Sequence, residues 1–343
     1  MCRMKAPTVA FVIISCACLH ACSRDESRIV VSTTSTFEDN FDHVGSVTLD
    51  TTILIGSINT LDVSPSGRLL AGDLMAQEVR LFESSGEHIR RLEIDQCAPG
   101  LDRPTIGTFV FGERIVAYNW NAAFLFDASG SCVKRIEDLF SSSLCTTKDT
   151  LYAFIRRRPA RMKLFSKDLE PIREYELPPP RLPTVVSVSG GLMGREIACT
   201  ASEVSYLYTD EPDVAQLHNP GHKVHEPANY TRPESFQDNH TNTGELSDNL
   251  LDLRRTSDLS VGAFELDRDH RIVAFENWHP GSKRGSPAMV LNLISRSAPE
   301  RSYSFTTSKW PFAARNGTLY ARDQAPITVA TNPSFDLYRL KSK

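Results

Sequence analysis

The sequence has no long hydrophobic run apart from residues 6–19, and Thr8 and Ser15 interrupt even this run. A membrane-spanning helix needs roughly 20 apolar residues in a row, so a polytopic membrane protein is excluded. A strong excess of basic charge is also missing, because 42 Asp and Glu residues balance 38 Lys and Arg residues. This balance argues against a nucleic-acid-binding protein. With 343 residues, of which 41% are hydrophobic, the chain can fold around a core rather than remain disordered.

Two chemical motifs are absent as well. No Gly-x-Ser-x-Gly segment is present, so nothing supports a serine nucleophile of the α/β-hydrolase kind. Cys97, Cys132, Cys145 and Cys199 lack Cys-x-x-Cys spacing, which argues against a zinc ribbon or a redox motif. In an exported protein these cysteines could form up to two disulfides, in three alternative full pairings. Cys199 lies in an apolar strand pattern, and we expect it to be a buried free thiol.

The N-terminal segment has the layout of a secretory signal peptide, with Arg3 and Lys5 before the short apolar run. The residues that follow, Leu19-His20-Ala21-Cys22, resemble the lipobox of bacterial lipoproteins, although His20 departs from the usual pattern. The resemblance implies a signal peptide over residues 1–22 and a lipid on Cys22. An ordinary secretory signal is the alternative. Because Ser23 rather than Asp follows the cysteine, the resemblance favours the outer membrane in a host that has two membranes.

A pattern of a turn, two mostly apolar residues, an alanine and a polar residue recurs along the chain. Its alanines are Ala71, Ala117, Ala153, Ala198, Ala274 and Ala321. A second apolar segment and another turn follow most copies. Short strands joined by such turns, in units of roughly 40 to 50 residues, are typical of β-propeller blades. We therefore predict an all-β fold with six blades, in which each alanine lies on the second strand of its blade. Seven blades are the alternative.

Residues 64–73, Ser-Pro-Ser-Gly-Arg-Leu-Leu-Ala-Gly-Asp, together with residues 78–86, resemble a repeat of the NHL type. In that family a glycine turn leads to a strand ending in Asp, then to a strand ending in Phe and a second glycine turn. Residues 96–101 are similar to the connector after the first blade of bacterial exported six-bladed propellers, which are often lipoproteins. The resemblance implies the propeller fold for most of the chain. It implies no particular activity, because propellers host many functions.

A propeller has to close its ring, because an open sheet edge invites aggregation. Residues 336–340 resemble a third strand, which leaves the last blade one strand short, and we expect residues 44–49 to supply its outer strand. Residues 43–343 then form the propeller, and residues 23–42 form a flexible tether. Between the fourth and fifth blades we expect an insertion at about residues 218–255, which is poor in aliphatic residues. Its histidines, His218, His222, His225 and His240, are interpreted as solvated.

The loop after the second strand of each blade lies on one face of a propeller, around the central channel. Here these positions are polar, of mixed charge, and include two tryptophans. They are Asp73, Asn119, Trp120, Arg156, Glu276, Asn277, Trp278, Arg322 and Asp323, with Arg157 and Thr200 beside them. Polar groups that converge between aromatic walls suit a sugar or a peptide. The alternative is that these are ordinary loop residues, and that Asp73 satisfies backbone amides of its turn.

These patterns predict an envelope-anchored monomer that binds a protein partner or a small glycan or peptide at this face. The interpretation needs no cofactor and no nucleic acid, and the membrane is reached through the lipid alone. The alternative is a metal-dependent hydrolase or lyase, since the sequence is similar in outline to gluconolactonase-type propellers. That resemblance implies a divalent cation such as calcium, with Glu276, Asn119, Asn277, Asp73 and Asp323 as oxygen ligands and Arg156 and Arg322 intruding. A purely structural envelope component is the third hypothesis.

Overall fold

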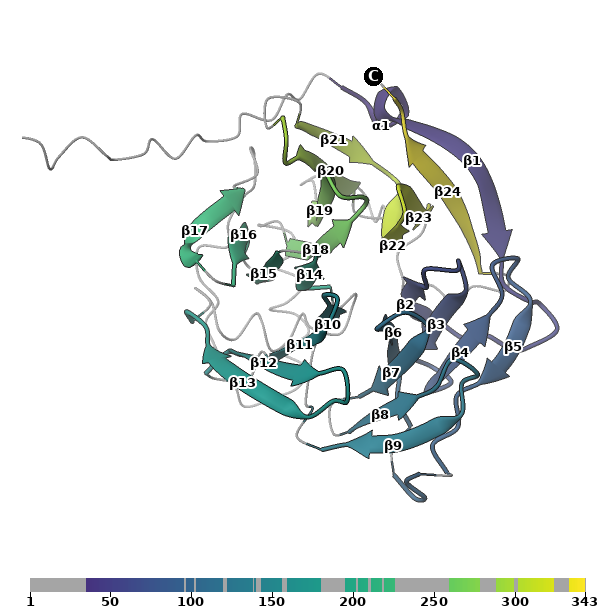
Figure 1. The fold of residues 1–343 in the computed structure, drawn as a ribbon. Coiled ribbons are helices and arrows are strands. Elements are labelled where there is room, and N and C mark those ends of the chain that lie inside the picture. The colour runs from purple at the N-terminus through teal and green to yellow at the C-terminus, as the bar shows by residue number, and fades with distance from the viewer. Residues whose placement is uncertain are drawn as a thin grey trace, which may run out of the picture.

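The computed structural model describes residues 35–342 of the chain with several gaps. The gaps are residues 96, 102, 120–121, 138, 140–142, 156–158, 180–194, 202, 209–210, 218, 226–258, 278–287, 299–301 and 324–332. The described strands form six four-stranded sheets, which stand as blades around a central axis (Figure 1). The predicted all-β, six-bladed propeller is therefore confirmed, and the seven-bladed alternative is not.

The first five blades take their strands in chain order from the axis outward. Blade 1 contains β2 (Ile58–Val63), β3 (Leu69–Asp73), β4 (Glu78–Phe82) and β5 (His88–Arg91). Blade 2 contains β6 (Ile106–Val110), β7 (Arg114–Tyr118), β8 (Ala123–Phe126) and β9 (Cys132–Ile136). Blade 3 contains β10 (Ser143–Thr146), β11 (Thr150–Ile155), β12 (Arg161–Ser166) and β13 (Pro171–Glu176).

The second half of the ring begins after a gap in the described residues. Blade 4 contains β14 (Ile197–Cys199), β15 (Val204–Tyr208), β16 (Glu211–Gln216) and β17 (Asn219–His225). Blade 5 contains β18 (Leu259–Glu265), β19 (His270–Asn277), β20 (Ala288–Ser295) and β21 (Tyr303–Thr307). Blade 6 contains β22 (Trp310–Arg315), β23 (Thr318–Arg322), β24 (Ser334–Leu340) and, as its outer strand, β1 (Phe41–Thr48).

The core of the protein lies between neighbouring blades. The inner strands β3 and β8 are buried at every residue, whereas the outermost strand β13 is exposed along most of its length. Leu70 and Val79 of blade 1 pack in one apolar cluster with Ile115 and Phe124 of blade 2. Burial of such side chains is the main favourable contribution to folding. The apolar layers therefore fix the innermost strands, and the residues at their ends, around the axis.

The ring closes as predicted, by pairing of the two ends of the described chain. β1 runs antiparallel to β24, from Phe41 opposite Leu340 to Thr48 opposite Ser334. A short helix, α1 (Phe37–Asn40), precedes β1 and is capped by Thr36. Phe37 is 2% exposed and stacks on Phe41 with 4.8 Å between ring centroids. The propeller domain thus includes residues 37–42, and the prediction that they belong to the tether, made because they carry no repeat signature, is wrong. Residues 23–34 lie outside the described part.

Blade 4 differs from the prediction by one strand. Ala198 lies on β14, the innermost strand, and not on the second strand as the other repeat alanines do. The second strand of this blade, β15, contains no alanine. The backbone of residues 219–225 forms the outer strand β17, so the predicted insertion does not begin at 218. The rest of the predicted insertion, residues 226–255, lies outside the described residues.

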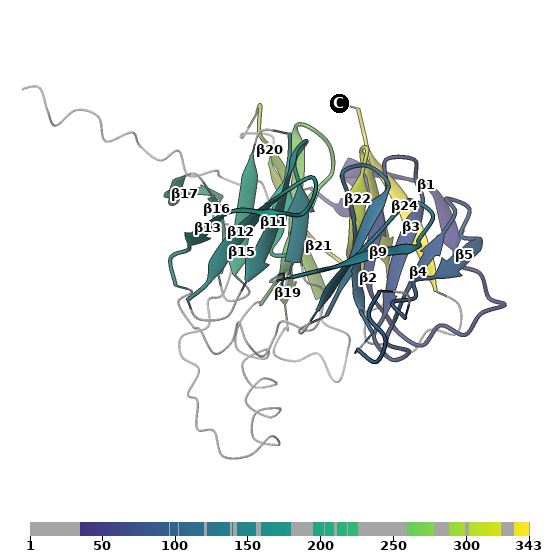
Figure 2. The same ribbon diagram turned by 60° about the horizontal axis from the view of Figure 1, so that its bottom comes forward.

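The alternating strand directions define two faces of the disc. The loop face carries the ends of the second strands, such as Asp73 and Asn119, and the connections between blades. The turn face carries the turns between first and second strands, such as 64–68 and 316–317. Arg339 pairs with Thr318 beside one of these turns, and the backbone N–H of Lys341 donates to Asn40, so the C-terminal end of β24 and helix α1 lie on the turn face. Figure 2 shows the disc from its side, with that end of β24 at the upper edge.

Two disulfides are present, Cys97–Cys132 and Cys145–Cys199. The prediction of a free thiol at Cys199 is wrong, because this residue lies on an innermost strand next to the one that carries Cys145. The bond therefore joins β10 of blade 3 to β14 of blade 4. Disulfides are typical of proteins in oxidising compartments, which favours an extracytoplasmic location. Within the described part of the chain, no helix has the length and apolar character needed to cross a membrane.

Candidate functional site

The central channel is the first place where a ligand could bind, and it is narrow. Its cavity has a volume of about 130 Å³ and is lined by residues of all six innermost strands. Small-molecule sites usually occupy roughly 300 to 1,000 Å³. The channel therefore holds water-sized groups, and a sugar or peptide has to bind at its rim.

Arg195 explains why the channel is narrow. This residue lies two positions before the start of β14, and its guanidinium donates to the Leu61 carbonyl and, at 3.2 Å, to Asp62 Oδ1. Asp62 in turn accepts hydrogen bonds from Thr108 Oγ1 and the Phe109 amide, at 2.7 and 2.8 Å. The side chain thus extends across the channel from blade 4 to blade 1, and the chain of contacts continues to blade 2. Nothing in the local sequence predicts this contact, since 133 residues separate Arg195 and Asp62.

A glycine of blade 5 permits this position of Arg195. The amide of Ala263 donates to the Arg195 carbonyl at 2.9 Å, and Gly262 pairs with Arg195 in an isolated bridge. A Cβ atom on Gly262 would lie 2.9 Å from both Cβ and O of Arg195. That distance is far below van der Waals contact, so only glycine allows the two backbones to approach.

Two predicted site residues on the loop face, Asp73 and Asn119, make structural hydrogen bonds. Asp73 is 2% exposed, and its carboxylate accepts from the amides of Gly56, Ser57, Met75 and Ala76. Asn119 accepts from the Ala122 amide and donates to the Arg103 carbonyl. In both blades the end of the second strand is thereby fixed to its own turn and to the connection from the previous blade. These bonds support the interpretation of Asp73 as a residue that satisfies backbone amides.

The other predicted residues divide into three groups. Glu276 is buried near the end of β19, and the backbone of Asn277 ends the same strand. Trp120, Arg156, Arg157 and Trp278, like Cys22, lie outside the described residues. Thr200 lies in the turn between β14 and β15, on the turn face, because blade 4 is displaced by one strand.

Arg322 and Asp323, at the loop-face end of β23, have opposite surroundings. Arg322 is 7% exposed and lies against two phenyl rings, with its Cζ 5.8 Å from the centroid of Phe312 and 5.6 Å from that of Phe335. Burial lowers the pKa of this guanidinium. Asp323 is exposed and accepts hydrogen bonds from Lys309 Nζ and Ser308 Oγ, both at 2.8 Å. The hydrogen bond from Lys309 lowers the pKa of Asp323.

Two of the predicted cation ligands, Asp73 and Asp323, are already bound to other groups. The Asp73 oxygens accept from backbone amides, and those of Asp323 accept from an ammonium and a hydroxyl group. No group of three or more His, Cys, Asp or Glu side chains that could hold a metal ion occurs within the described ranges. These two carboxylates therefore do not support the gluconolactonase-type alternative.

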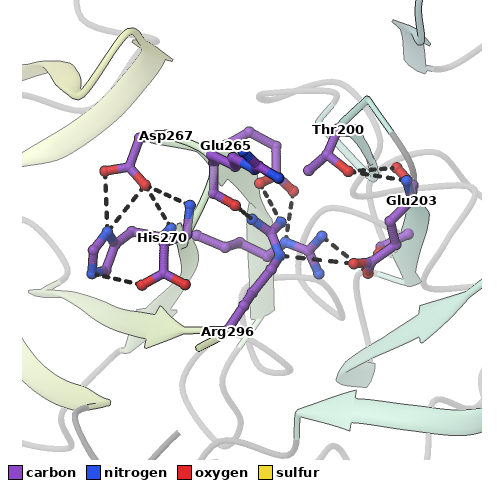
Figure 3. A network of polar contacts seen from close by, with 10 residues as sticks. Thr200, Glu203, Glu265, Asp267, His270 and Arg296 are labelled. Atoms are coloured by element: carbon purple, nitrogen blue, oxygen red, sulfur yellow. Dashed lines mark hydrogen bonds and ion pairs between the residues drawn. The ribbon is translucent and has the colours of Figure 1, made fainter. Parts of the chain in front are cut away.

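The turn face carries a buried network of charges between blades 4 and 5 (Figure 3). Arg271 is 2% exposed, and its Nε donates to Glu265 Oε1 at 2.7 Å. Its Nη2 lies 3.4 Å from Glu203 Oε1, and Arg296 contacts both carboxylates. Burial raises the pKa of Glu203, but the hydrogen bond from Ser205 and the charges of Arg271 and Arg296 outweigh it and lower this pKa overall. Every charge in the network has a partner, so the network joins two blades and leaves no group for a ligand.

The chain matches no family model and no curated protein. Among solved structures it is similar to a DUF4221-family member from Bacteroides vulgatus, with 11% identity, a TM-score of 0.58 and coverage of 89% of this chain and 99% of that one. It is also similar to a Bacteroides fragilis protein named a "putative exported protein", with 12% identity, a TM-score of 0.59 and coverage of 91% and 98%. At such low identity the likeness shows the propeller fold alone. The NHL type of the repeats remains a resemblance of sequence.

Proposed function

We propose that the protein is an exported binding module, anchored to a membrane through a lipid on Cys22, with its loop face turned outward. One observation carries the proposal: helix α1 and the start of β1 lie on the turn face. An anchor on the N-terminal side of α1 therefore joins the disc at its turn face, on the side opposite to the loop face. The loop face, where blades present their connections, is then free to meet a partner.

Exposed apolar residues on the loop face of blade 1 support a protein partner. Leu54 is 88% exposed and Met75 is 70% exposed, and Leu74 beside them is 43% exposed. The segments that carry them are joined by a hydrogen bond from the Leu74 amide to the Ser57 carbonyl, at 2.9 Å. Exposed apolar residues that gather on one surface mark interaction sites more often than scattered ones do.

The experiment is affinity capture from envelope extracts with the double variant Leu54→Glu/Met75→Glu. We expect the variant to lose a partner that the wild-type protein retains. Ile172→Glu is the matched control, because Ile172 is 58% exposed but lies on the outer strand β13. Equal capture by all three proteins would contradict the proposal.

The anchor is tested in the same preparation by Cys22→Ala. We expect the wild-type protein in the membrane fraction and the variant in the soluble fraction. A variant that stays with the membrane would show that Cys22 is not the anchor.

A further inference from the structure

Blade 6 places an arginine where blades 1, 2, 3 and 5 bury an aromatic residue or glycine. The position directly follows the repeat alanine on the second strand, and its side chain belongs to the layer between blades. It is occupied by Gly72, Tyr118, Phe154, Phe275 and Arg322 in blades 1, 2, 3, 5 and 6. Tyr118, Phe154 and Phe275 are each at most 2% exposed. A charged side chain at a core position is a local violation of the pattern, and such violations concentrate at functional sites.

Among the residues that the structure describes, the guanidinium of Arg322 has no counter-charge. Its Nη1 is buried and has no hydrogen-bond partner, and no carboxylate of the described residues pairs with it. Contacts with the faces of Phe312 and Phe335 compensate in part, because a cation is attracted to an aromatic face. They do not replace an anion, and arginine stays charged in proteins.

Two carboxylates of the same blade, those of Asp323 and Asp336, pair with Lys309. Asp323 is the next residue in the chain, but it pairs with Lys309 Nζ at 2.8 Å. Asp336 also lies 3.4 Å from Lys309. Together with Arg322 and Lys309, these aspartates make two cations and two anions. Both aspartates pair with Lys309, and neither pairs with Arg322. Arg322 therefore has no carboxylate partner among the described residues, although Asp323 follows it directly in the chain.

We propose that Arg322 binds the carboxylate of an acidic ligand at the loop-face end of blade 6. A planar carboxylate fits the two parallel N–H donors of a guanidinium. The charges of Lys309, Asp323, Asp336 and Arg322 sum to zero, so this end of the blade has no excess positive charge, and one carboxylate matches the guanidinium better than a doubly charged phosphate. The inference rests on the proposed binding role of the loop face and gives it a ligand class.

The test is thermal unfolding of the purified protein with sodium glucuronate, N-acetylglutamate or phosphate, at constant ionic strength, and with glucose as the neutral control. We expect a saturable rise in Tm of about 3 °C or more with one of the carboxylates, and none with glucose. Glucuronate and N-acetylglutamate distinguish a saccharide from a peptide source of the carboxylate. A shift with phosphate alone, or with no anion, would overturn the proposal.

The matched variants are Arg322→Met and Arg322→Phe, the second of which restores the aromatic residue of blades 2, 3 and 5. Both should lose the carboxylate-dependent rise in Tm while the unliganded protein remains folded. A rise that persists in either variant would also overturn the proposal.

A second measurement does not need these variants to fold. Trp310 is 4% exposed and pairs with Arg322 across β22 and β23, so its fluorescence should report the ligand. We expect the carboxylate to change the emission of the wild-type protein and not that of Trp310→Phe. If partner capture fails but this titration succeeds, the proposal of a protein partner is wrong and that of a carboxylate ligand stands. If capture succeeds but the titration fails, only the proposal of a carboxylate ligand is overturned.

Discussion

The two faces of the propeller each bury an arginine, and the two arginines differ in their partners. Arg271 on the turn face is 2% exposed and contacts the carboxylates of Glu265 and Glu203. Arg322 on the loop face is 7% exposed and contacts only aromatic rings and strand neighbours among the described residues. An arginine thus completes a network of ion pairs at the turn face, whereas the arginine at the loop face has no carboxylate partner among the described residues. The difference shows that burial alone does not reveal the role of a charged residue, whereas its partners do.

Replacing the paired arginine gives the largest expected effect. Arg271→Met leaves Glu265 and Glu203 with less compensation in a buried place, and we expect it to lower the free energy of unfolding by about 3 to 5 kcal/mol. Urea denaturation measures the change. Arg322→Met is the control, and we expect it to change stability by less than about 1 kcal/mol, because no partner is left unpaired. Equal losses in the two variants would abolish the distinction between the two arginines.

A similar contrast exists between two aspartates of the loop face. Asp73→Ala removes the acceptor of four backbone amides, and we expect a loss of about 2 to 3 kcal/mol. Asp323→Ala removes an exposed ion pair, and we expect a loss of about 0.5 kcal/mol. The same denaturation experiment compares them. An Asp73→Ala protein as stable as Asp323→Ala would show that the amides find other partners.

The smallest expected effect is a dependence on pH. The pKa of Glu203 is lowered in the folded protein from its ordinary value of 4.5, because its hydrogen bond from Ser205 and the nearby arginines outweigh burial. The corresponding stability is present above pH 4.5 and is lost as pH falls through the lowered pKa. Without Arg271 this lowering is weaker. The difference in unfolding free energy between wild type and Arg271→Met should therefore narrow, by about 1 kcal/mol, between pH 7 and pH 4. Denaturation curves at both pH values measure this difference in unfolding free energy. A difference that is the same at pH 7 and pH 4 would show that Glu203 does not contribute to the stability that Arg271 provides.

The repeat predicted the number of blades because each second strand has to pack closely in the core. Ala71, Ala117, Ala153, Ala274 and Ala321 all lie on second strands. Ala198 fits the same local pattern but lies on β14, a short buried strand next to the axis, which also requires small and apolar residues. Because Ala198 lies on the first strand of blade 4, Thr200 lies on the face opposite to the predicted one, and Cys199 is bonded to Cys145 instead of being a free thiol.

Contacts between strands, and those between blades, could not be predicted from the sequence pattern. Positions such as Asp73 and Arg322 follow from the register of a single repeat. Their roles depend on groups that fold next to them, such as the amides of residues 56–57 or the rings of Phe312 and Phe335. Arg195 shows the limit most clearly, because its partners in blade 1 are set by ring closure and not by any local spacing.

The order of the cysteines has a consequence for how the chain matures. Each disulfide joins cysteines that are consecutive along the propeller, Cys97 to Cys132 and then Cys145 to Cys199. A chain that enters an oxidising compartment from its N-terminus meets each correct partner before the next cysteine arrives. Native pairing then needs no later exchange of disulfides. The strand β1, in contrast, is made first but has to wait for β24, so the covalent bonds can be complete in a ring that is still open.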